Sequence, residues 1–267
     1  MFDSGFGGLT VARALIDLLP GEDLVYVGDT GRYPYGPKPL PDVRRYAVEI
    51  AEHLVETHLV KALVVACNTA TAAALDQLQE QLTVPVIGVV EPGVRAAGRV
   101  TGSKRVGVIG TVGTIGSGAY QRAFAALAPD ITLTCAACPG FVEFVERGET
   151  ASEQVHVLAE RLLTRVQEAK VDTLLLGCTH YPFLARTLTD VMGRDVVLVS
   201  SADETAFAVR AALAATFLGA DPPAAVDHPT RSGRHRFLSS GDVETFRRLG
   251  RRLLGPELDH VEPVSWG

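Results

Sequence analysis

The 267-residue sequence lacks several features that would place it in common classes. No run of about 18 uncharged apolar residues occurs, so no membrane-spanning helix is expected. Met1 to Gly5 contain neither a basic nor an apolar stretch, so no signal peptide is visible. Only four cysteines are present, and without an export signal we expect thiols rather than disulfides. The net charge is −6, so nucleic acid is not expected as a main partner.

Motifs for common cofactors are also missing. The glycine-rich turn from Asp3 to Gly8 lacks both the G-x-G-x-x-G order and a Walker lysine, which argues against a nucleotide. Cys135 and Cys138 form one C-x-x-C spacing without a second pair or a histidine cluster, so a zinc site is not expected and a structural role is favoured. No lysine lies in the cysteine motifs described below; the lysines are Lys38, Lys61, Lys104 and Lys170. We therefore expect neither a metal nor a Schiff-base cofactor.

Short apolar segments instead alternate with longer amphipathic ones along the chain. The short segments predict buried strands over 24–28, 61–66, 84–89, 105–109, 131–135, 172–176 and 195–199. The longer segments predict helices over 8–19, 41–58, 70–82, 116–127, 150–169, 182–192, 203–218 and 242–253. This alternation predicts an α/β fold with mostly parallel sheets covered by helices.

A weak internal repeat suggests two similar domains. In each half a polar loop follows an early strand and a cysteine follows a later one. The distance is 64 residues from Asp3 to Cys67 and 67 residues from Thr111 to Cys178. The repeat predicts two pseudosymmetric domains that face each other, one of residues 1–91 plus 203–267 and one of residues 92–202. The segment from Pro222 to Arg234 is the most loop-like part of the chain.

Cys67 and Cys178 each follow a predicted buried strand and precede a predicted helix. Ligands of open α/β sheets bind at that edge, and a helix N-terminus lowers the pKa of a thiol. Two thiols presented in the same way suit a reaction that removes a proton from one face of a substrate and returns it to the other. The alternative is a pair of buried structural cysteines, which behave as small apolar residues.

The residues after the cysteines offer hydrogen bonds. Asn68, Thr69 and Thr179 are suited to bind a carboxylate at a helix N-terminus, and they are equally suited to cap that helix. His180, beside a thiol, is a candidate proton partner, with a core histidine as the alternative.

Other candidates are weaker. Tyr35 and Gly36 lie in a Pro/Gly-rich loop that forms either a wall of the pocket or a rigid surface loop. Thr111 and Thr114 have hydroxyls suited to a carboxylate, and Glu143 is either an acid at the pocket mouth or a solvated residue. The turn at Asp3 and Ser4 either brings backbone amides close to an anion, or its side chains cap the helix that follows. The arginines of the C-terminal tail favour a solvated, salt-bridged face over a polyanion site.

In these residues the chain closely resembles the glutamate racemases. The shared motifs are Asp3-Ser4-Gly5, Pro34-Tyr35-Gly36, Cys67-Asn68-Thr69 and Cys178-Thr179-His180-Tyr181-Pro182. The similarity runs from residue 2 to about residue 218 and is weaker beyond. The related aspartate racemases usually carry a glutamate at the position of His180, so the resemblance favours glutamate. Members of the family usually have several residues before the position of Phe2, so a short first strand is expected here.

The resemblance implies a cofactor-independent racemase with its active site in the cleft between two domains. Cys67 and Cys178 match the two acid/base residues, and Asp3, Asp29, Glu143 and His180 match residues that assist. Substrate contacts are implied for Asp3, Ser4, Tyr35, Gly36, Asn68, Thr69, Thr111, Thr114, Thr179 and His180. The product would be D-glutamate for peptidoglycan and cell-wall biogenesis, which maintains cell shape. It would be made in the cytoplasm by an enzyme that is often a homodimer.

Three rival hypotheses remain open. One is a racemase of broader specificity, or another enzyme of the superfamily, that acts on aspartate, hydantoins or maleate. Another is a non-catalytic protein whose domains close on an acidic amino acid. A third is an acyl- or thiol-transfer enzyme with a single nucleophilic cysteine, which would form a covalent intermediate.

Overall fold

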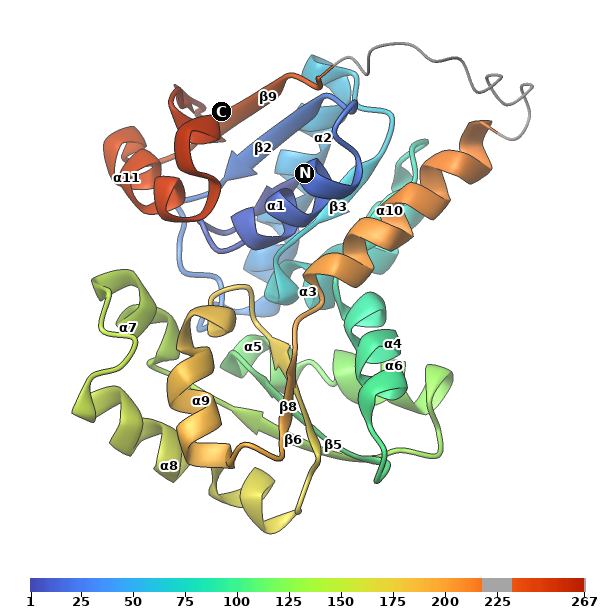
Figure 1. Ribbon diagram of the computed structural model, residues 1–267. Coiled ribbons are helices and arrows are strands. Elements are labelled where there is room, and N and C mark those ends of the chain that lie inside the picture. Colours follow the sequence, from blue (N-terminus) through green and yellow to red (C-terminus); the bar gives the residue numbers. More distant parts are fainter. Residues whose placement is uncertain (218–231, 267) are drawn as a thin grey trace.

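The computed structural model describes residues 1–217 and 232–266, and its strands form two parallel sheets (Figure 1). The first sheet contains β1 (Phe2–Asp3), β2 (Leu24–Gly28), β3 (Leu63–Val65), β4 (Val86–Gly88), β9 (His235–Ser239) and β10 (Glu262–Pro263). The second sheet contains β5 (Arg105–Gly110), β6 (Thr132–Ala137), β7 (Thr173–Gly177) and β8 (Val197–Val199). These sheets confirm the predicted α/β class.

The two sheets have the same connectivity. The second sheet has the order β6-β5-β7-β8, and the first contains the matching order β2-β1-β3-β4. The first sheet is extended beyond β2 by β9 and β10, which come from the C-terminal part of the chain. The internal repeat seen in the sequence is therefore a repeat of topology, and β3 corresponds to β7.

Helices cover both faces of each sheet. They are α1 (Leu9–Leu18), α2 (Leu40–His58), α3 (Asn68–Gln81), α4 (Val90–Val100), α5 (Val112–Gly116), α6 (Ala119–Leu127), α7 (Phe141–Arg147), α8 (Glu153–Glu168), α9 (Ala185–Met192), α10 (Ala202–Phe217) and α11 (Val243–Leu254). Short 3-10 helices span Tyr181–Leu184 and Gly255–Leu258. Over residues 1–217 and 232–266, no helix combines the length and apolarity needed to cross a bilayer.

The strands are buried on both sides, as their short apolar runs predict. In β3, Leu63 and Val65 pack into the core beneath α2 and α3, whereas Val64 packs into the core on the opposite face. In β7, Leu174 and Leu175 are adjacent in sequence and both are fully buried. Since successive side chains of a strand point to opposite faces, both faces of these sheets are covered.

Several elements differ from the prediction. The segment near 91–104, for which no helix was predicted, forms α4, and its buried residues Val90, Val94 and Ala97 follow helical spacing. The helix predicted over 116–127 begins later, as α6 at Ala119 after Gly118, whose φ is +72°, and the separate short helix α5 precedes it. Helix α7 and strands β9 and β10 were not predicted. Most of the predicted loop from Pro222 to Arg234 lies outside the described residues.

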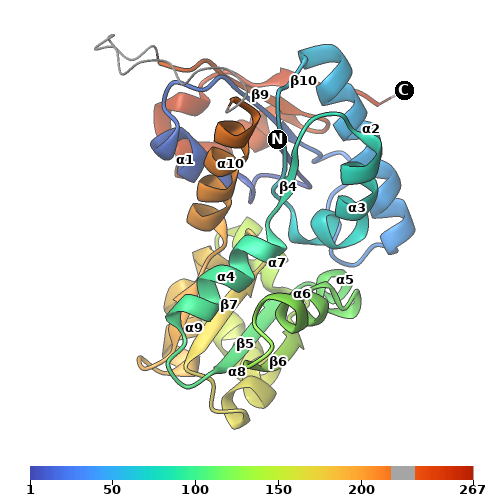
Figure 2. The ribbon, with the colours of Figure 1, turned by 90° about the vertical axis from the view of Figure 1, so that its right-hand side faces the viewer.

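The arrangement supports the predicted division of the chain. One sheet uses strands from residues 2–88 and 235–263, and the other uses strands from residues 105–199. Figures 1 and 2 show the two sheets one above the other, with α4 and α10 where the chain passes between them. We therefore propose residues 1–91 plus 203–267 and residues 92–202 as the two domains, here called the first and second halves.

Candidate active site

The two cysteines occupy equivalent places in the two sheets. Cys67 follows β3 and is the N-cap of α3, and Cys178 directly follows β7. Extending the register of β1 on β3 puts Ser4 beside Cys67, and extending that of β5 on β7 puts Thr111 beside Cys178. The parallel sheets thus bring a thiol and a hydroxyl to the carboxyl edge of each half, where ligands of such sheets bind.

Both thiols line one pocket, which has about 600 Å³ of empty space, part of it open to solvent. Both halves contribute to its walls. The lining residues are Ser4, Tyr33, Pro34, Tyr35, Gly36, Pro37, Cys67, Asn68, Thr69, Thr111, Val112, Cys138, Pro139, Gly140, Val142, Glu143, Cys178, Thr179 and His180. The pocket therefore collects most of the candidates taken from the sequence.

Burial controls the acidity of both thiols. Burial, and after it the nearby Asp3 carboxylate, raises the pKa of Cys67 from its ordinary 9.0 to about 12. Hydrogen bonds from the Ala70 amide and from Ser4 oppose this increase. Burial also raises the pKa of Cys178, although the backbone amides of His180 and Tyr181 lower it. The expected lowering by helix N-termini is thus present but smaller than the effect of desolvation.

The surroundings of Cys67 come from the turn after β1. The Cys67 thiol lies 3.8 Å from the Ser4 hydroxyl, to which it donates. Asp3 is fully buried, and its Oδ2 accepts hydrogen bonds from the amides of Gly5 and Gly8. A Cβ atom on Gly8 would lie only 2.5 Å from the Asp3 Cβ, so glycine is required there. Strand β1 has only two residues, as expected, and the glycine-rich turn holds Asp3 in place.

The surroundings of Cys178 centre on His180. The His180 residue is 2% exposed, and its Nε2 lies 3.7 Å from the carboxylate of Glu146 on α7. Phe6 packs edge-on against the ring, with centroids 4.9 Å apart. A Cβ atom on Gly7 would lie 2.5 Å from the His180 Nδ1, so the glycine allows the first half to approach the second.

Direct hydrogen bonds join the two halves at the pocket. The hydroxyl of Thr69 lies 3.0 Å from those of both Thr111 and Thr114, which are 2.9 Å from each other. Tyr120 donates to the Asn68 Oδ1 at 2.6 Å. The buried Nδ2 of Asn68 has no hydrogen-bond partner within the described part of the chain, and Asn68 lines the pocket. It is therefore available to a ligand.

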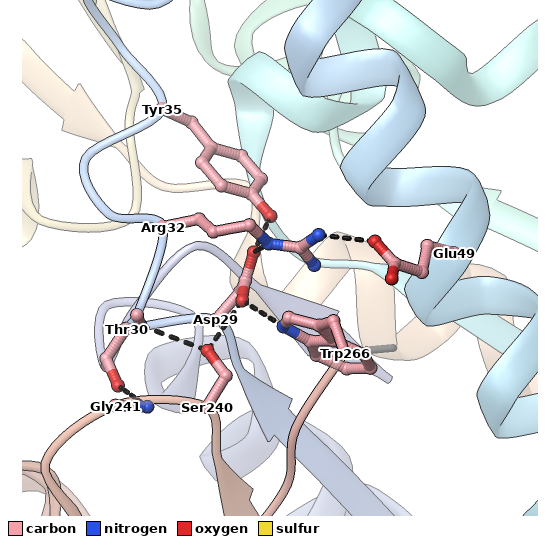
Figure 3. Close-up of polar contacts among 9 residues, drawn as sticks. Asp29, Thr30, Arg32, Tyr35, Glu49, Ser240, Gly241 and Trp266 are labelled. Atoms are coloured by element: carbon pink, nitrogen blue, oxygen red, sulfur yellow. Dashed lines mark hydrogen bonds and ion pairs between the residues drawn. The ribbon is translucent and has the colours of Figure 1, made fainter.

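Some predicted site residues lie behind the pocket wall. Thr114 is fully buried and supports Thr69 and Thr111. Asp29 is also fully buried and accepts a hydrogen bond from the Tyr35 hydroxyl (Figure 3). Like Asp3, they are absent from the residues that line the pocket.

Helix α7 carries two carboxylates with different surroundings. Glu143 lines the pocket, but the carboxylate next to His180 belongs to Glu146, which we did not select from the sequence. The spacing of three residues puts both carboxylates on the same side of α7, and this could have suggested Glu146 as a candidate.

The other two cysteines, Cys135 and Cys138, lie in different surroundings. Cys138 is buried and lines the pocket, and its carbonyl accepts a hydrogen bond from Tyr181. Cys135 packs against the core beside α4 and α6. No group of three or more His, Cys, Asp or Glu side chains in residues 1–217 and 232–266 is arranged to hold a metal ion.

Comparison with known proteins agrees with this geometry. Residues 9–211 match the family model of the Asp/Glu/Hydantoin racemases. Together with the two sheets, the match defines the protein as an isomerase of the racemase class.

Relatives narrow the assignment. A glutamate racemase of Parafrankia sp. (strain EAN1pec) is 53% identical over 261 residues, which cover 98% of this chain and 92% of the relative. The crystal structure of a glutamate racemase isoform from Bacillus anthracis superimposes with a TM-score of 0.88 at 40% identity, covering 99% of this chain and 95% of that one. A glutamate racemase from Francisella tularensis, solved with D-glutamate, gives 0.88 at 32% identity, with coverage of 99% and 96%. The chain belongs to the glutamate racemases.

Proposed function

We propose that this protein interconverts L- and D-glutamate by proton transfer at Cα between two thiols. The observation that supports the proposal most directly is that Cys67 and Cys178 leave equivalent strand ends and line the same pocket. In this mechanism Cys67 removes the α-proton from D-glutamate and Cys178 removes it from L-glutamate. In each direction the other cysteine donates a proton to the opposite face.

The raised thiol pKa values fit this chemistry. The α-proton of an amino acid is a very weak acid, and a thiolate with a raised pKa is a stronger base than an ordinary one. The raised pKa values favour the protonated form of both thiols, whereas proton removal from the substrate requires one of them as a thiolate. Opposite directions of reaction require opposite protonation states of the pair. Enclosure by both halves limits water around the carbanion-like transition state.

The polar residues of the pocket have separable roles in this proposal. The side chain of Asn68 and the hydroxyls of Ser4, Thr69, Thr111 and Thr179 would bind the carboxylates of glutamate. His180 would assist Cys178 and also contact the substrate, with Glu143 at the pocket mouth. Asp3 would act electrostatically on Cys67, because its carboxylate is buried beside the thiol without lining the pocket. Tyr35 and Gly36 would form a wall against the substrate, with Asp29 behind them and Thr114 behind the threonines.

We further propose that the reaction needs no cofactor, occurs in the cytoplasm and supplies D-glutamate for peptidoglycan, with a homodimer as the active form. None of the lysines is among the residues that line the pocket, so the pocket offers no Schiff-base nitrogen. The purified protein should therefore have no absorbance from a Schiff-base cofactor in the visible range, and the proposal also predicts that chelators leave activity intact.

Chiral chromatography of incubations with L-glutamate, L-aspartate and a substituted hydantoin tests the assignment. Loss of one methylene is worth about 10–200-fold in a simple pocket, and unpaired donors would increase the discrimination against aspartate. We expect racemisation of glutamate with a preference beyond that range. Comparable efficiency with aspartate would favour the broad-specificity racemase. Binding of glutamate without racemisation would favour the binding protein.

A further inference from the structure

The Asp29 carboxylate connects the pocket wall to the C-terminal segment of the chain (Figure 3). Its Oδ1 accepts hydrogen bonds from the Trp266 indole at 2.7 Å and from the Ser240 hydroxyl at 2.6 Å. Its Oδ2 accepts from the Arg32 Nε at 2.8 Å and from the Tyr35 hydroxyl. Four donors thus occupy a fully buried carboxylate. Asp29 is therefore held as a structural acceptor and is not directed at the reacting atoms.

Trp266 is held by its ring as well as by its N–H group. The Arg32 guanidinium lies 4.8 Å from the centroid of the Trp266 ring and 4.3 Å from that of Tyr46. The same guanidinium pairs with Glu49 on α2. Stacking of a cation on an aromatic ring stabilises such contacts. The C-terminal segment is therefore attached to the interior of the first half by Trp266.

Backbone contacts align the same two segments. The Gly31 amide donates to the Ser240 hydroxyl, and the Gly241 amide donates to the Thr30 hydroxyl, both at 3.0 Å. The Ser240 amide donates to the Gly28 carbonyl at 3.1 Å. The loop that leaves β2 is thus fixed against the residues that leave β9.

The contacts continue from this loop into the pocket and across to the second half. The Tyr35 ring lines the pocket and is 1% exposed. The adjacent Gly36 carbonyl accepts a hydrogen bond from the Gly113 amide of α5 at 2.9 Å. A Cβ atom on Gly36 would lie 2.8 Å from the Thr111 Cβ. A small displacement of Tyr35 would therefore move the wall that meets the second half.

We infer that Trp266 and Ser240 are positioning residues for the active site, which act through Asp29 on the wall formed by Tyr35 and Gly36. This inference rests on the proposed glutamate racemisation. Trp266 holds the Asp29 carboxylate in the position where it accepts the hydrogen bond from the Tyr35 hydroxyl. This hydrogen bond fixes Tyr35, and Tyr35 in turn keeps the pocket in the shape that binds substrate. Weakening this chain of contacts lowers the competent fraction and raises the apparent KM by the same factor.

A double-mutant cycle with Trp266→Phe and Tyr35→Phe tests the inference. Trp266→Phe keeps an aromatic ring at this position and removes the N–H donor to Asp29. We expect its KM for glutamate to rise about tenfold, as loss of one hydrogen bond to a charged group allows, with a smaller change in kcat. If Trp266 acts through Tyr35, the double variant will have the KM of Tyr35→Phe alone. KM increases that multiply would overturn the inference, and so would a wild-type KM in Trp266→Phe.

Two further variants protect the test against a general loss of folding. Arg236→Gln removes an ion pair with Glu262 between β9 and β10, so it perturbs the same segment without touching Asp29. Its KM should stay at the wild-type value, and an equal increase would show that the effect is not specific to Asp29. Ser240→Ala removes the other donor to Oδ1 and should also raise KM. Circular dichroism and thermal unfolding should show the same folded fraction in all variants.

The inference and the proposed function can fail separately. If the unmodified protein racemises glutamate and the cycle is additive, only the positioning role fails. If the unmodified protein binds glutamate without racemising it, the proposed function fails. The same cycle is then measured as calorimetric Kd values for glutamate, in which coupling supports the positioning role and additivity contradicts it.

Discussion

The two halves present their thiols by the same topology but surround them with different chemistry. Cys67 caps α3 and has a buried carboxylate, Asp3, nearby. Cys178 is followed by a 3-10 helix, and its neighbour His180 lies 3.7 Å from Glu146. Repetition of the sheet order explains why the thiols meet in one pocket. It does not make the two sides of that pocket equal.

This difference indicates that the two directions of reaction are assisted by different groups. Enantiomers have equal free energies in water, so kcat/KM must be the same for L- and D-glutamate in every variant. Unequal assistance can therefore appear only in kcat and KM taken separately, or in the reactivity of each thiol. Experiments that compare the two sides should measure those quantities.

The largest effect should come from removing either thiol. Cys67→Ala and Cys178→Ala should each lose at least about 10²–10⁴-fold in kcat in both directions, because proton removal and return need opposite thiols. Polarimetry with each enantiomer measures this loss. Cys135→Ala is the matched control and should keep most of the activity, because Cys135 does not line the pocket. Full activity in either of the first two variants would show that its cysteine is incidental.

Removal of the Asp3 charge should change Cys67 more than Cys178, because this charge is the second-largest cause of the raised pKa at Cys67 and a lesser one at Cys178. Asp3→Asn keeps an oxygen for the amides of Gly5 and Gly8 but removes the negative charge that raises the pKa of Cys67. A decrease of one pKa unit would accelerate alkylation of Cys67 by iodoacetamide about threefold at pH 8, because a tenfold larger thiolate fraction is partly offset by lower nucleophilicity. Mass spectrometry of each cysteine-containing peptide measures the rates. Equal acceleration at Cys178 would argue against a stronger effect of this charge on Cys67.

The carboxylate of Glu146 should affect kcat through the Cys178 side of the pocket. Glu146→Gln should lower kcat about fivefold, because it removes a partly exposed charge next to His180. Glu143→Gln, on the same helix, is the matched control and should change kcat less. Steady-state kinetics with both enantiomers decide between them. A larger effect of Glu143→Gln would assign the assisting role to Glu143, as the sequence predicted.

A smaller effect concerns stability at high pH. The folded pKa of Cys67 is raised from 9.0 to about 12, so between these values the unfolded chain has lost a proton that the folded chain keeps. The free energy of unfolding should then fall as pH rises from 9 to 12, by about 1 kcal/mol for this thiol over the first unit. Urea unfolding measures the slope. Cys67→Ala should have a shallower slope, and an unchanged one would contradict the buried, protonated thiol.

Much of the site was visible in the sequence because it depends on strand ends. The apolar segments before Cys67 and Cys178 predicted buried parallel strands, and the carboxyl ends of such strands meet at one edge. The segment that forms α4 was harder to predict, because Pro92, Gly93 and Gly98 interrupt its helical pattern.

The contacts that support the pocket wall could not be predicted from the sequence, and the reason is a different one. Asp29 is held by Ser240 and Trp266, which lie more than 200 residues away along the chain. Likewise, the choice between Glu143 and Glu146 depends on how α7 docks beside His180. Spacing along a sequence reports neighbours on one element, and it does not report which distant elements pack together.

The central claim is that two bases act on opposite faces of the substrate, and isotope exchange tests it directly. L-Glutamate is incubated with the protein in deuterated water, and both enantiomers are recovered at low conversion. We expect D-glutamate that carries deuterium at Cα, while the remaining L-glutamate keeps its protium. Product that retains the original protium, or deuterium that enters recovered L-glutamate as fast as product forms, would contradict the two-thiol mechanism.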